Sequence, residues 1–211
     1  MIDRFINLIN SKLGCAYIWG GQNDEILTNE KLDLLMKTFG QEHYITKNFD
    51  ARKWIGRKGY YDCSGLVCFC LQSLGLITKG SDYTASTLYS QLCTPVTKAE
   101  LKTGDLCFNK STTGIVHVGV YMGNNRVTHA RGTFYGVCNT ELFNSFNTFG
   151  RLKCFKEEME KPVVIDELKE ALTFLSKKAG IDYTVWYKVA KDVRYLDKCF
   201  IKIANAWKKV G

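Results

Sequence analysis

Several features that mark particular classes of protein are scarce or missing in this chain of 211 residues. It holds only two prolines, and no charged leader followed by a long apolar stretch opens it. A membrane-spanning helix needs about 20 consecutive apolar residues, and no segment approaches that length. We therefore expect no membrane insertion, and we expect a chain without an export signal of its own.

The nine cysteines and three histidines form no metal-binding or disulfide pattern. No C-x-x-C pair occurs, and the histidines lack the spacing of a zinc finger. An odd number of cysteines in a chain of this length favours free thiols made in a reducing cytosol. The sequence therefore predicts no disulfide, no metal ion and no cofactor.

The formal net charge of +8 fits a nucleic acid, an anionic membrane or an anionic polymer such as a cell wall as partner. The basic residues are scattered, and neither a basic arm nor a nucleic-acid motif is present. A solvated, mildly basic surface is the favoured interpretation. We expect no nucleic-acid partner.

What is present is a series of helical patterns followed by a hairpin and strands. Apolar residues recur at helical spacing over residues 2–13 and 64–74, and a shorter helix is expected at 84–93. Residues 24–60 are largely polar and are interpreted as an insertion over the site, with two short helices. Residues 115–132 predict a β-hairpin. Further strands are expected at 134–138 and 151–155.

A domain boundary is predicted in the charged segment "KEEMEKP", residues 156–162. Beyond it the pattern is helical, with one amphipathic helix over residues 166–179 and a second apolar series from Val189 to Trp207. We expect a main domain over residues 1–158 and a small helical module over residues 162–211. About fifty residues seldom form a stable core alone, so the module is expected to dock, to bind a surface or to form a homodimer.

The predicted hairpin brings two histidines together. If its loop is the three residues Gly123 to Asn125, Gly119 lies opposite His129 and leaves room for an imidazole hydrogen bond to His117. A two-residue loop would break this register. Because side chains alternate along a strand, three residues are expected to share the core face: Val116, Val118 and Val120.

Cys63 lies in the stretch "GYYDCSGLVCF", at the predicted start of a helix near Asp62. The helix dipole and an adjacent imidazolium would lower the pKa of a thiol there. Cys63 is then the nucleophile, His117 the base and His129 the group that orients the base, with the Cys63 N–H and Tyr17 meeting the oxyanion. From the residues alone, an inert buried cysteine remains the alternative.

Five motifs, in a fixed order along the chain, help to decide whether Cys63 is a nucleophile or an inert buried cysteine. They are "LGCAYIWGG", "YDCSGLV", "LKTGDLCF", "IVHVGVYMGN" and "VTHA", within about residues 1 to 155. Together they resemble the NlpC family of cell-wall cysteine peptidases. The resemblance implies an α+β, papain-like fold, with an antiparallel sheet packed against the nucleophile helix. It also places the family's catalytic roles on Cys63, His117 and His129.

The resemblance implies hydrolysis of an amide in peptidoglycan stem peptides, commonly between D-γ-glutamate and a diamino acid. Some relatives cleave the amide between N-acetylmuramic acid and L-alanine. Tyr17, Asp62 and Ser64 would contact the substrate, while Trp19 would pack. Ala16 replaces the usual proline, and the usual arginine is absent from "SDYTASTLYSQ".

Peptidoglycan is therefore the expected partner, and a phage endolysin or tail hydrolase of a Gram-positive host is the expected context. Such an enzyme is made in the host cytoplasm and acts on the wall after release. Two further readings stay open. The same residues could transfer an acyl group to an amine or alcohol, or the chain could be a non-enzymatic phage-tail or wall-binding protein.

Overall fold

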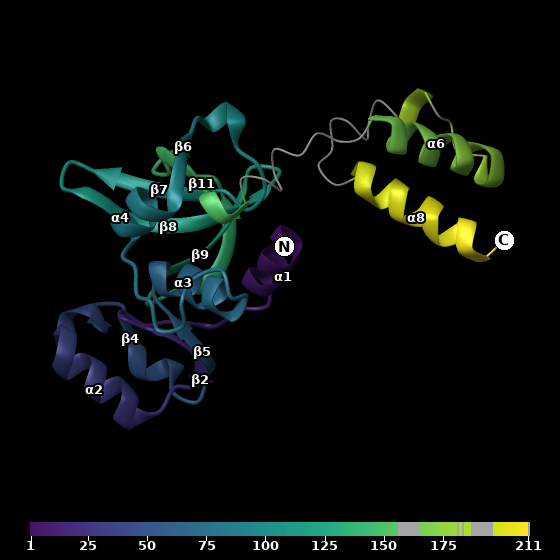
Figure 1. The fold of residues 1–211 in the computed structure, drawn as a ribbon. Helices are drawn as coiled ribbons and strands as arrows, with labels where there is room; N and C mark the ends of the chain where they lie inside the picture. The colour runs from purple at the N-terminus through teal and green to yellow at the C-terminus, as the bar shows by residue number, and fades with distance from the viewer. Residues whose placement is uncertain (156–164, 181, 183, 187–195, 211) are drawn as a thin grey trace. The chain divides into compact units, whose positions relative to one another are not determined.

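The computed structural model describes residues 1–155, 165–180, 182, 184–186 and 196–210. The chain divides into two compact units, Met1–Met159 and Glu160–Gly211 (Figure 1). Their expected roles, a catalytic domain and a module for docking, wall binding or dimerisation, stay predictions. Val189 and Val193, which begin the predicted second helix of the module, lie outside the described residues.

The first unit is built on a six-stranded antiparallel sheet with the order β10-β9-β8-β7-β11-β6 (Figure 1). Its strands are β6 (Cys93–Val96), β7 (Leu106–Ser111), β8 (Gly114–Gly123), β9 (Arg126–Gly132), β10 (Gly136–Glu141) and β11 (Thr148–Leu152). The predicted hairpin is confirmed as β8 and β9. The strand expected at 134–138 begins and ends later, and the one expected at 151–155 ends in a 3-10 turn, Lys153–Phe155.

Helix α3 (Cys63–Ser73) packs against β8 and β9 of this sheet and is confirmed where the sequence predicts it. Asp62 caps it by accepting a hydrogen bond from the Gly65 N–H. A side chain at Gly65 would overlap the Gly21 carbonyl oxygen, so glycine allows the helix to approach that loop closely. Further helices of this unit are α1 (Ile2–Asn10), α4 (Ala85–Thr87), the π-helical turn η3 (Leu88–Leu92) and the 3-10 helix η4 (Lys98–Glu100).

The segment 24–60 and its flanks form a second, smaller layer below α3 in Figure 1. Its sheet has the order β1-β5-β2, with β1 (Ala16–Tyr17), β2 (Gln22–Ile26) and β5 (Lys58–Tyr61). The two predicted short helices are α2 (Asn29–Phe39) and the 3-10 helix η2 (Ala51–Trp54), and between them lie η1 (Gln41–His43), β3 (Ile45–Thr46) and β4 (Phe49–Asp50). This layer has a core of its own, centred on buried side chains that include Leu32, Tyr44 and Tyr60.

The hairpin turn differs from the expected three-residue loop. Asn124 and Asn125 both have positive φ, at 48° and 57°, and form a two-residue turn that pairs Gly123 with Arg126. The register nevertheless holds, because β8 has a bulge at Met122 that shifts the pairing by one residue. Val120 therefore pairs with Thr128, which is the register that the histidine prediction needs.

The core face of β8 is only partly as expected. Val118 and Val120 are fully buried, but Val116 is 55% exposed. The pairing of β7 with β8 shifts between Asn109 and Lys110, which leaves Val116 as the extra residue of a second bulge. The prediction that Val116 faces the core is wrong because the bulge breaks the alternation of side chains.

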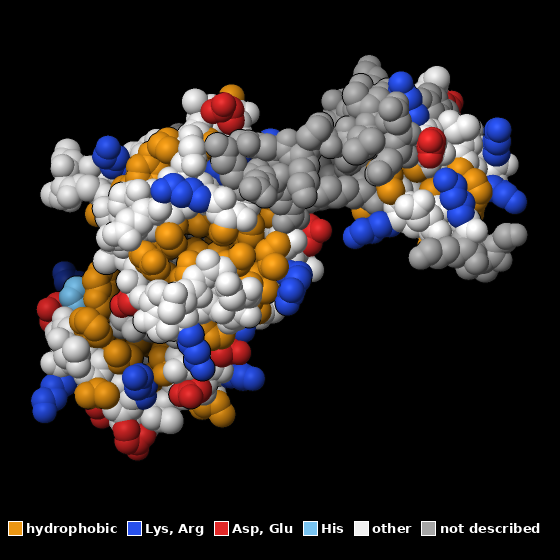
Figure 2. All heavy atoms as spheres, viewed as in Figure 1, with side chains coloured by type: hydrophobic (Ala, Val, Ile, Leu, Met, Phe, Trp, Pro, Cys, Tyr) orange, Lys and Arg blue, Asp and Glu red, His pale blue; other side chains and the backbone are white. Residues whose placement is uncertain are grey.

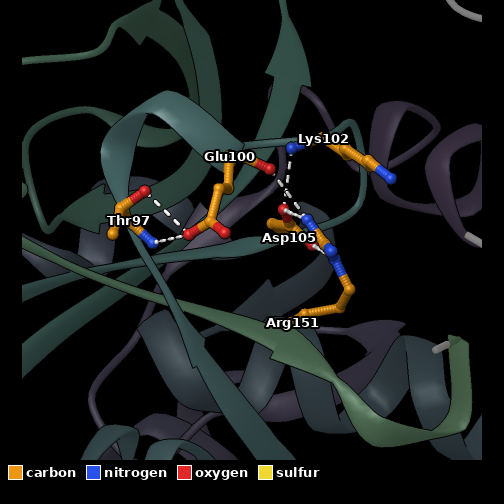
Figure 3. Close-up of polar contacts among 5 residues, drawn as sticks. All are labelled: Thr97, Glu100, Lys102, Asp105 and Arg151. Carbon is orange, nitrogen blue, oxygen red and sulfur yellow. Dashed lines mark hydrogen bonds and ion pairs between the residues drawn. The ribbon is translucent and has the colours of Figure 1, made fainter. Parts of the chain in front are cut away.

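The turn "LKTGDL" that enters β7 is held by a buried ion pair (Figure 3). The Arg151 guanidinium donates from Nε to Asp105 Oδ1 at 3.0 Å and from Nη2 to Asp105 Oδ2 at 2.9 Å. Asp105 Oδ2 also accepts from the Lys102 N–H at 2.7 Å, and Arg151 donates to the Glu100 carbonyl at 2.8 Å. The pair thus joins β11 to the turn before β7.

The second unit contains the helices α6 (Ile165–Ala179) and α8 (Leu196–Val210). Gly180, with φ of 64°, ends α6 as predicted. The two helices pack through a small apolar cluster whose buried members are Ala171, Leu172, Leu175, Phe200 and Ala204. Ile203 and Trp207 of α8 remain about half exposed.

Candidate active site

Cys63 is the first residue of α3, and the acid before it ties the helix start to a neighbouring loop. Asp62 Oδ1 accepts from the Gly65 N–H at 2.6 Å and from the Ser64 hydroxyl at 3.1 Å, while Oδ2 accepts from the Gly20 N–H at 2.9 Å. Asp62 and Ser64, both predicted to contact the substrate, therefore lie beside Cys63 and bond to each other. Their contact with a substrate stays a prediction.

The sulfur of Cys63 meets backbone donors from two elements. The N–H groups of Val118, Ser64 and Cys63 itself favour its thiolate. The Val118 N–H belongs to the peptide that follows His117, so the sulfur lies against the part of β8 that carries the predicted base. The structure thus brings the tip of α3 and the hairpin together.

The protonation state of Cys63 differs from the expectation. Burial and then the Asp62 carboxylate raise the pKa of the thiol to about 12, and the three backbone donors only partly oppose them. The predicted lowering of this pKa is wrong, because desolvation outweighs the helix dipole. At neutral pH the resting site holds a neutral thiol.

The two predicted imidazoles are hydrogen-bonded to each other. His117 Nε2 lies 2.7 Å from His129 Nδ1, with the ring planes 66° apart. A Cβ built at Gly119 would lie 3.0 Å from His129 Cβ, so the glycine opposite His129 provides the room that the sequence suggested. Phe146 packs against both rings, with centroids 5.8 Å and 5.5 Å away.

Both imidazoles are held neutral. Burial, with a smaller effect of the Arg131 guanidinium, lowers the pKa of His117 to about 4. Burial, followed by His117 and Arg131, lowers the pKa of His129 to about 3. A neutral imidazole carries one N–H and one free lone pair, so one ring can accept a proton from a thiol while the other holds it in place.

Tyr17 lies at the edge of this site, in β1. Burial raises the pKa of its phenol, and Cys63 and Asp62 add to the rise, so its hydroxyl stays protonated and can donate a hydrogen bond. Trp19 packs as expected, because its ring stacks on His43 at a centroid distance of 4.4 Å, although it remains 42% exposed.

Three residues of the site escaped the sequence analysis: Thr140, Tyr44 and Arg131. The Thr140 hydroxyl lies 3.2 Å from His129 Nε2, but the strand predicted at 134–138 stopped before it. Tyr44 comes from the insertion, and its hydroxyl donates to the Trp19 carbonyl at 2.9 Å. Tertiary packing alone brings Tyr44 near the site. Arg131 lies on β9 two residues after His129, but nothing in the sequence signalled its effect on the two imidazoles.

Other kinds of site find no support in the described part of the chain. Its His, Cys, Asp and Glu side chains nowhere gather in a group of three that could hold a metal ion. Among these residues no helix has both the length and the apolar character to cross a membrane. On the face shown in Figure 2, Lys and Arg side chains are spread over the first unit in separate places rather than gathered in one patch.

Comparison with known proteins identifies a family and a fold for this chain. The sequence profile described as the NlpC/P60 family matches residues 14–148. A protein of Listeria seeligeri named "Probable endopeptidase p60" is 32% identical over 74 residues, which are 34% of this chain and 13% of that protein. The corresponding protein of Listeria grayi is 29% identical over 79 residues, or 37% of this chain and 15% of that protein. The match thus spans a small part of the length of these relatives.

Solved structures show the same fold. The peptidoglycan hydrolase RipB of Mycobacterium tuberculosis is 22% identical with a TM-score of 0.50, over 71% of this chain and 63% of that one. A P60 domain of a M. avium subspecies paratuberculosis antigen is 19% identical with a TM-score of 0.50, over 71% of this chain and 93% of that one. The predicted α+β, NlpC-type fold is confirmed. Because the profile covers more than half of its length, the chain belongs to the NlpC/P60 family.

Proposed function

We propose that this chain is a cysteine peptidase that hydrolyses an amide bond in the stem peptides of peptidoglycan. One observation carries the proposal: a hydrogen-bonded imidazole pair on the β8–β9 hairpin lies beside a thiol at the N-terminus of α3. Family membership and the names of the relatives, an endopeptidase and a peptidoglycan hydrolase, support the substrate class.

In the first half of the proposed reaction, Cys63 attacks the amide carbonyl. Because thiol and imidazole are both neutral at rest, the thiol proton passes to the free lone pair of His117 as the S–C bond forms. The carbonyl oxygen becomes an oxyanion, which the Cys63 N–H and the protonated Tyr17 hydroxyl stabilise. The C–N bond then breaks, and the His117 imidazolium returns its proton to the leaving amine.

In the second half, water replaces the amine. His117 accepts a proton from water as the water oxygen attacks the thioester. The C–S bond breaks, the carboxylic acid leaves, and the proton on His117 restores the Cys63 thiol. His129 keeps the ring of His117 in place throughout through the 2.7 Å hydrogen bond.

For the bond cleaved, we propose the link between D-γ-glutamate and the diamino acid. The two Listeria relatives are named probable endopeptidases, which favours a bond between two amino acids over the muramoyl-L-alanine amide. Asp62 and Ser64 at the tip of α3 are proposed to hold the stem peptide, because both lie next to the nucleophile.

Digestion of purified Gram-positive sacculi, followed by mass spectrometry of the released fragments, tests the proposal. The parent should release fragments whose masses identify the bond, and Cys63→Ala should release none. Cys154→Ala is the matched control, because it removes an exposed thiol of the same unit and should digest like the parent. Digestion by Cys63→Ala would refute thiol catalysis, and loss of activity on chelation would point to a metal instead.

The wider context is also a proposal: a phage-encoded lysin that is made in the host cytoplasm and reaches the wall after release. Free thiols at all nine cysteines support synthesis in a reducing compartment. Lysis of a Gram-positive host by the chain added from outside would support it. The proposal would be contradicted if the parent digested purified sacculi but lysed none of the intact Gram-positive hosts tested.

We further propose that the second unit forms a homodimer through its helices, because Ile203 and Trp207 leave apolar surface on α8. Light scattering should then give the mass of a dimer for the parent and of a monomer for Ile203→Glu. A monomeric parent would refute dimerisation.

A further inference from the structure

The two imidazoles belong to a longer row of hydrogen bonds that ends on the backbone. His117 Nε2 lies 2.7 Å from His129 Nδ1, and His129 Nε2 lies 3.2 Å from the Thr140 hydroxyl. The Thr140 hydroxyl in turn donates to the Glu141 carbonyl at 3.0 Å. The row therefore links the base to a fixed acceptor on β10.

The last bond gives the row a direction. A carbonyl can only accept, and a threonine hydroxyl has a single proton, so Thr140 must accept from His129 Nε2. His129 is then protonated at Nε2 and accepts at Nδ1. His117 consequently donates its Nε2 proton to His129 and keeps an unprotonated Nδ1.

We propose that Thr140 is a positioning residue that fixes the tautomers of both imidazoles, so that His117 offers Nδ1 as the free base. The tautomers follow from the bonds alone, while their catalytic consequence rests on the proposed function. If the row ran the other way, with Thr140 donating to His129, the proton of His117 would lie on Nδ1. His117 could then accept no proton from a thiol without first losing one.

Two observations support this arrangement. Burial keeps both rings neutral at neutral pH, so each ring has one donor and one acceptor nitrogen. All the hydrogen bonds of the row therefore donate in the same direction, from His117 toward the Glu141 carbonyl. The register of β10 against β9 pairs Cys138 with His129 and Thr140 with Val127, so the sheet itself fixes the position of the hydroxyl beside the ring.

Nitrogen-15 NMR of the imidazoles tests the inference on the full chain without substrate. Protonated and unprotonated ring nitrogens resonate far apart, and the chain has only three histidines, so His43→Gln leaves the two rings of interest. In that background we expect both rings to be protonated at Nε2. Thr140→Val removes the acceptor for the His129 Nε2 proton and should shift the tautomer ratio on the order of tenfold or more toward Nδ1.

Two variants separate this effect from a general disturbance of the sheet. Thr140→Ser keeps a hydroxyl and should keep the parental tautomers. Thr128→Val makes the same substitution at a buried threonine of β9 that bonds to Asn139 instead of a ring, and it should also keep them. Nδ1 protonation of the His129 ring in the parent, or parental tautomers in Thr140→Val, would overturn the inference.

A kinetic arm tests the catalytic consequence. With sacculi as substrate, Thr140→Val should lower kcat on the order of tenfold or more with KM little changed, and Thr140→Ser should recover most of the loss. A parental kcat in Thr140→Val would refute the catalytic part. If the parent digests no sacculi but shows the expected tautomers, the proposed function fails while the assignment of Thr140 stands.

Discussion

A methyl group added at Gly119 should disturb both the sheet and the site. Gly119 is buried on β8 and does not need positive φ, so alanine fits its backbone. The added Cβ would lie 2.5 Å from Val127 Cγ1 and 3.0 Å from His129 Cβ. Real Cβ atoms do not approach so closely, so β9 must move away from β8 around His129.

The size of the effect follows from these contacts. Val127 is fully buried against Phe146 and Phe149, and a β-branched side chain has few other rotamers, so it cannot easily turn aside. Overpacking of this kind costs about 1–3 kcal/mol of unfolding free energy. Moving His129 also lengthens its 2.7 Å bond to His117, and a separation much beyond about 3.2 Å would weaken it.

Urea unfolding and sacculus digestion measure the two effects on Gly119→Ala. Val127→Ala removes the nearer clashing atom, so Gly119→Ala should cost about 1 kcal/mol less in that background, within the usual range for coupled neighbours. Activity should recover only in part, because the 3.0 Å contact with His129 remains. Parental stability and parental activity in Gly119→Ala would refute the reasoning.

Three further predictions concern stability and pH. Asp105→Asn removes the carboxylate that neutralises the buried Arg151 guanidinium and should cost about 3–5 kcal/mol in urea unfolding. Asp105→Leu combined with Arg151→Met should cost less, and equal costs would contradict the argument. Asp62→Ala removes the cap of α3 and should cost about 0.5–2 kcal/mol in the same assay, and an unchanged midpoint would count against it. Because the pKa values of His117 and His129 are lowered from 6.5, the unfolded chain takes up protons first, so unfolding free energy should fall as pH drops from about 6.5 toward 4. Replacing both histidines with glutamine should flatten the pH 7 to 5 part of that curve.

Short-range sequence patterns predicted most of the helices and strands of the first unit outside the insertion. Asp62 before an apolar helical pattern marked the start of α3, and the alternation along residues 115–132 marked the hairpin. These signals work because helix caps and strand faces depend on neighbours in the sequence. The predicted pairing of the two imidazoles is correct although the predicted loop is not, because the bulge at Met122 compensates for the shorter turn.

The remaining features depend on contacts between distant parts of the chain. The bulge at Val116 arises from pairing with β7, and Thr140 reaches His129 through the register of β10. The pKa of Cys63 is set by burial, which the sequence cannot measure. Local sequence patterns therefore located the proposed nucleophile and base, but they could not predict the protonation states of these side chains.

The bulge at Met122 allows this hairpin to change its length. Deleting Met122 would leave the two-asparagine turn intact and would also keep the register, because Gly123 already pairs with Arg126 and Tyr121 with Val127 on the two sides of the bulge. His117 would therefore stay beside His129, and the local bend and added twist of the bulge would be lost. The end of this hairpin can thus lose one residue without moving either imidazole out of register, and a chain that lacks Met122 should keep an active site.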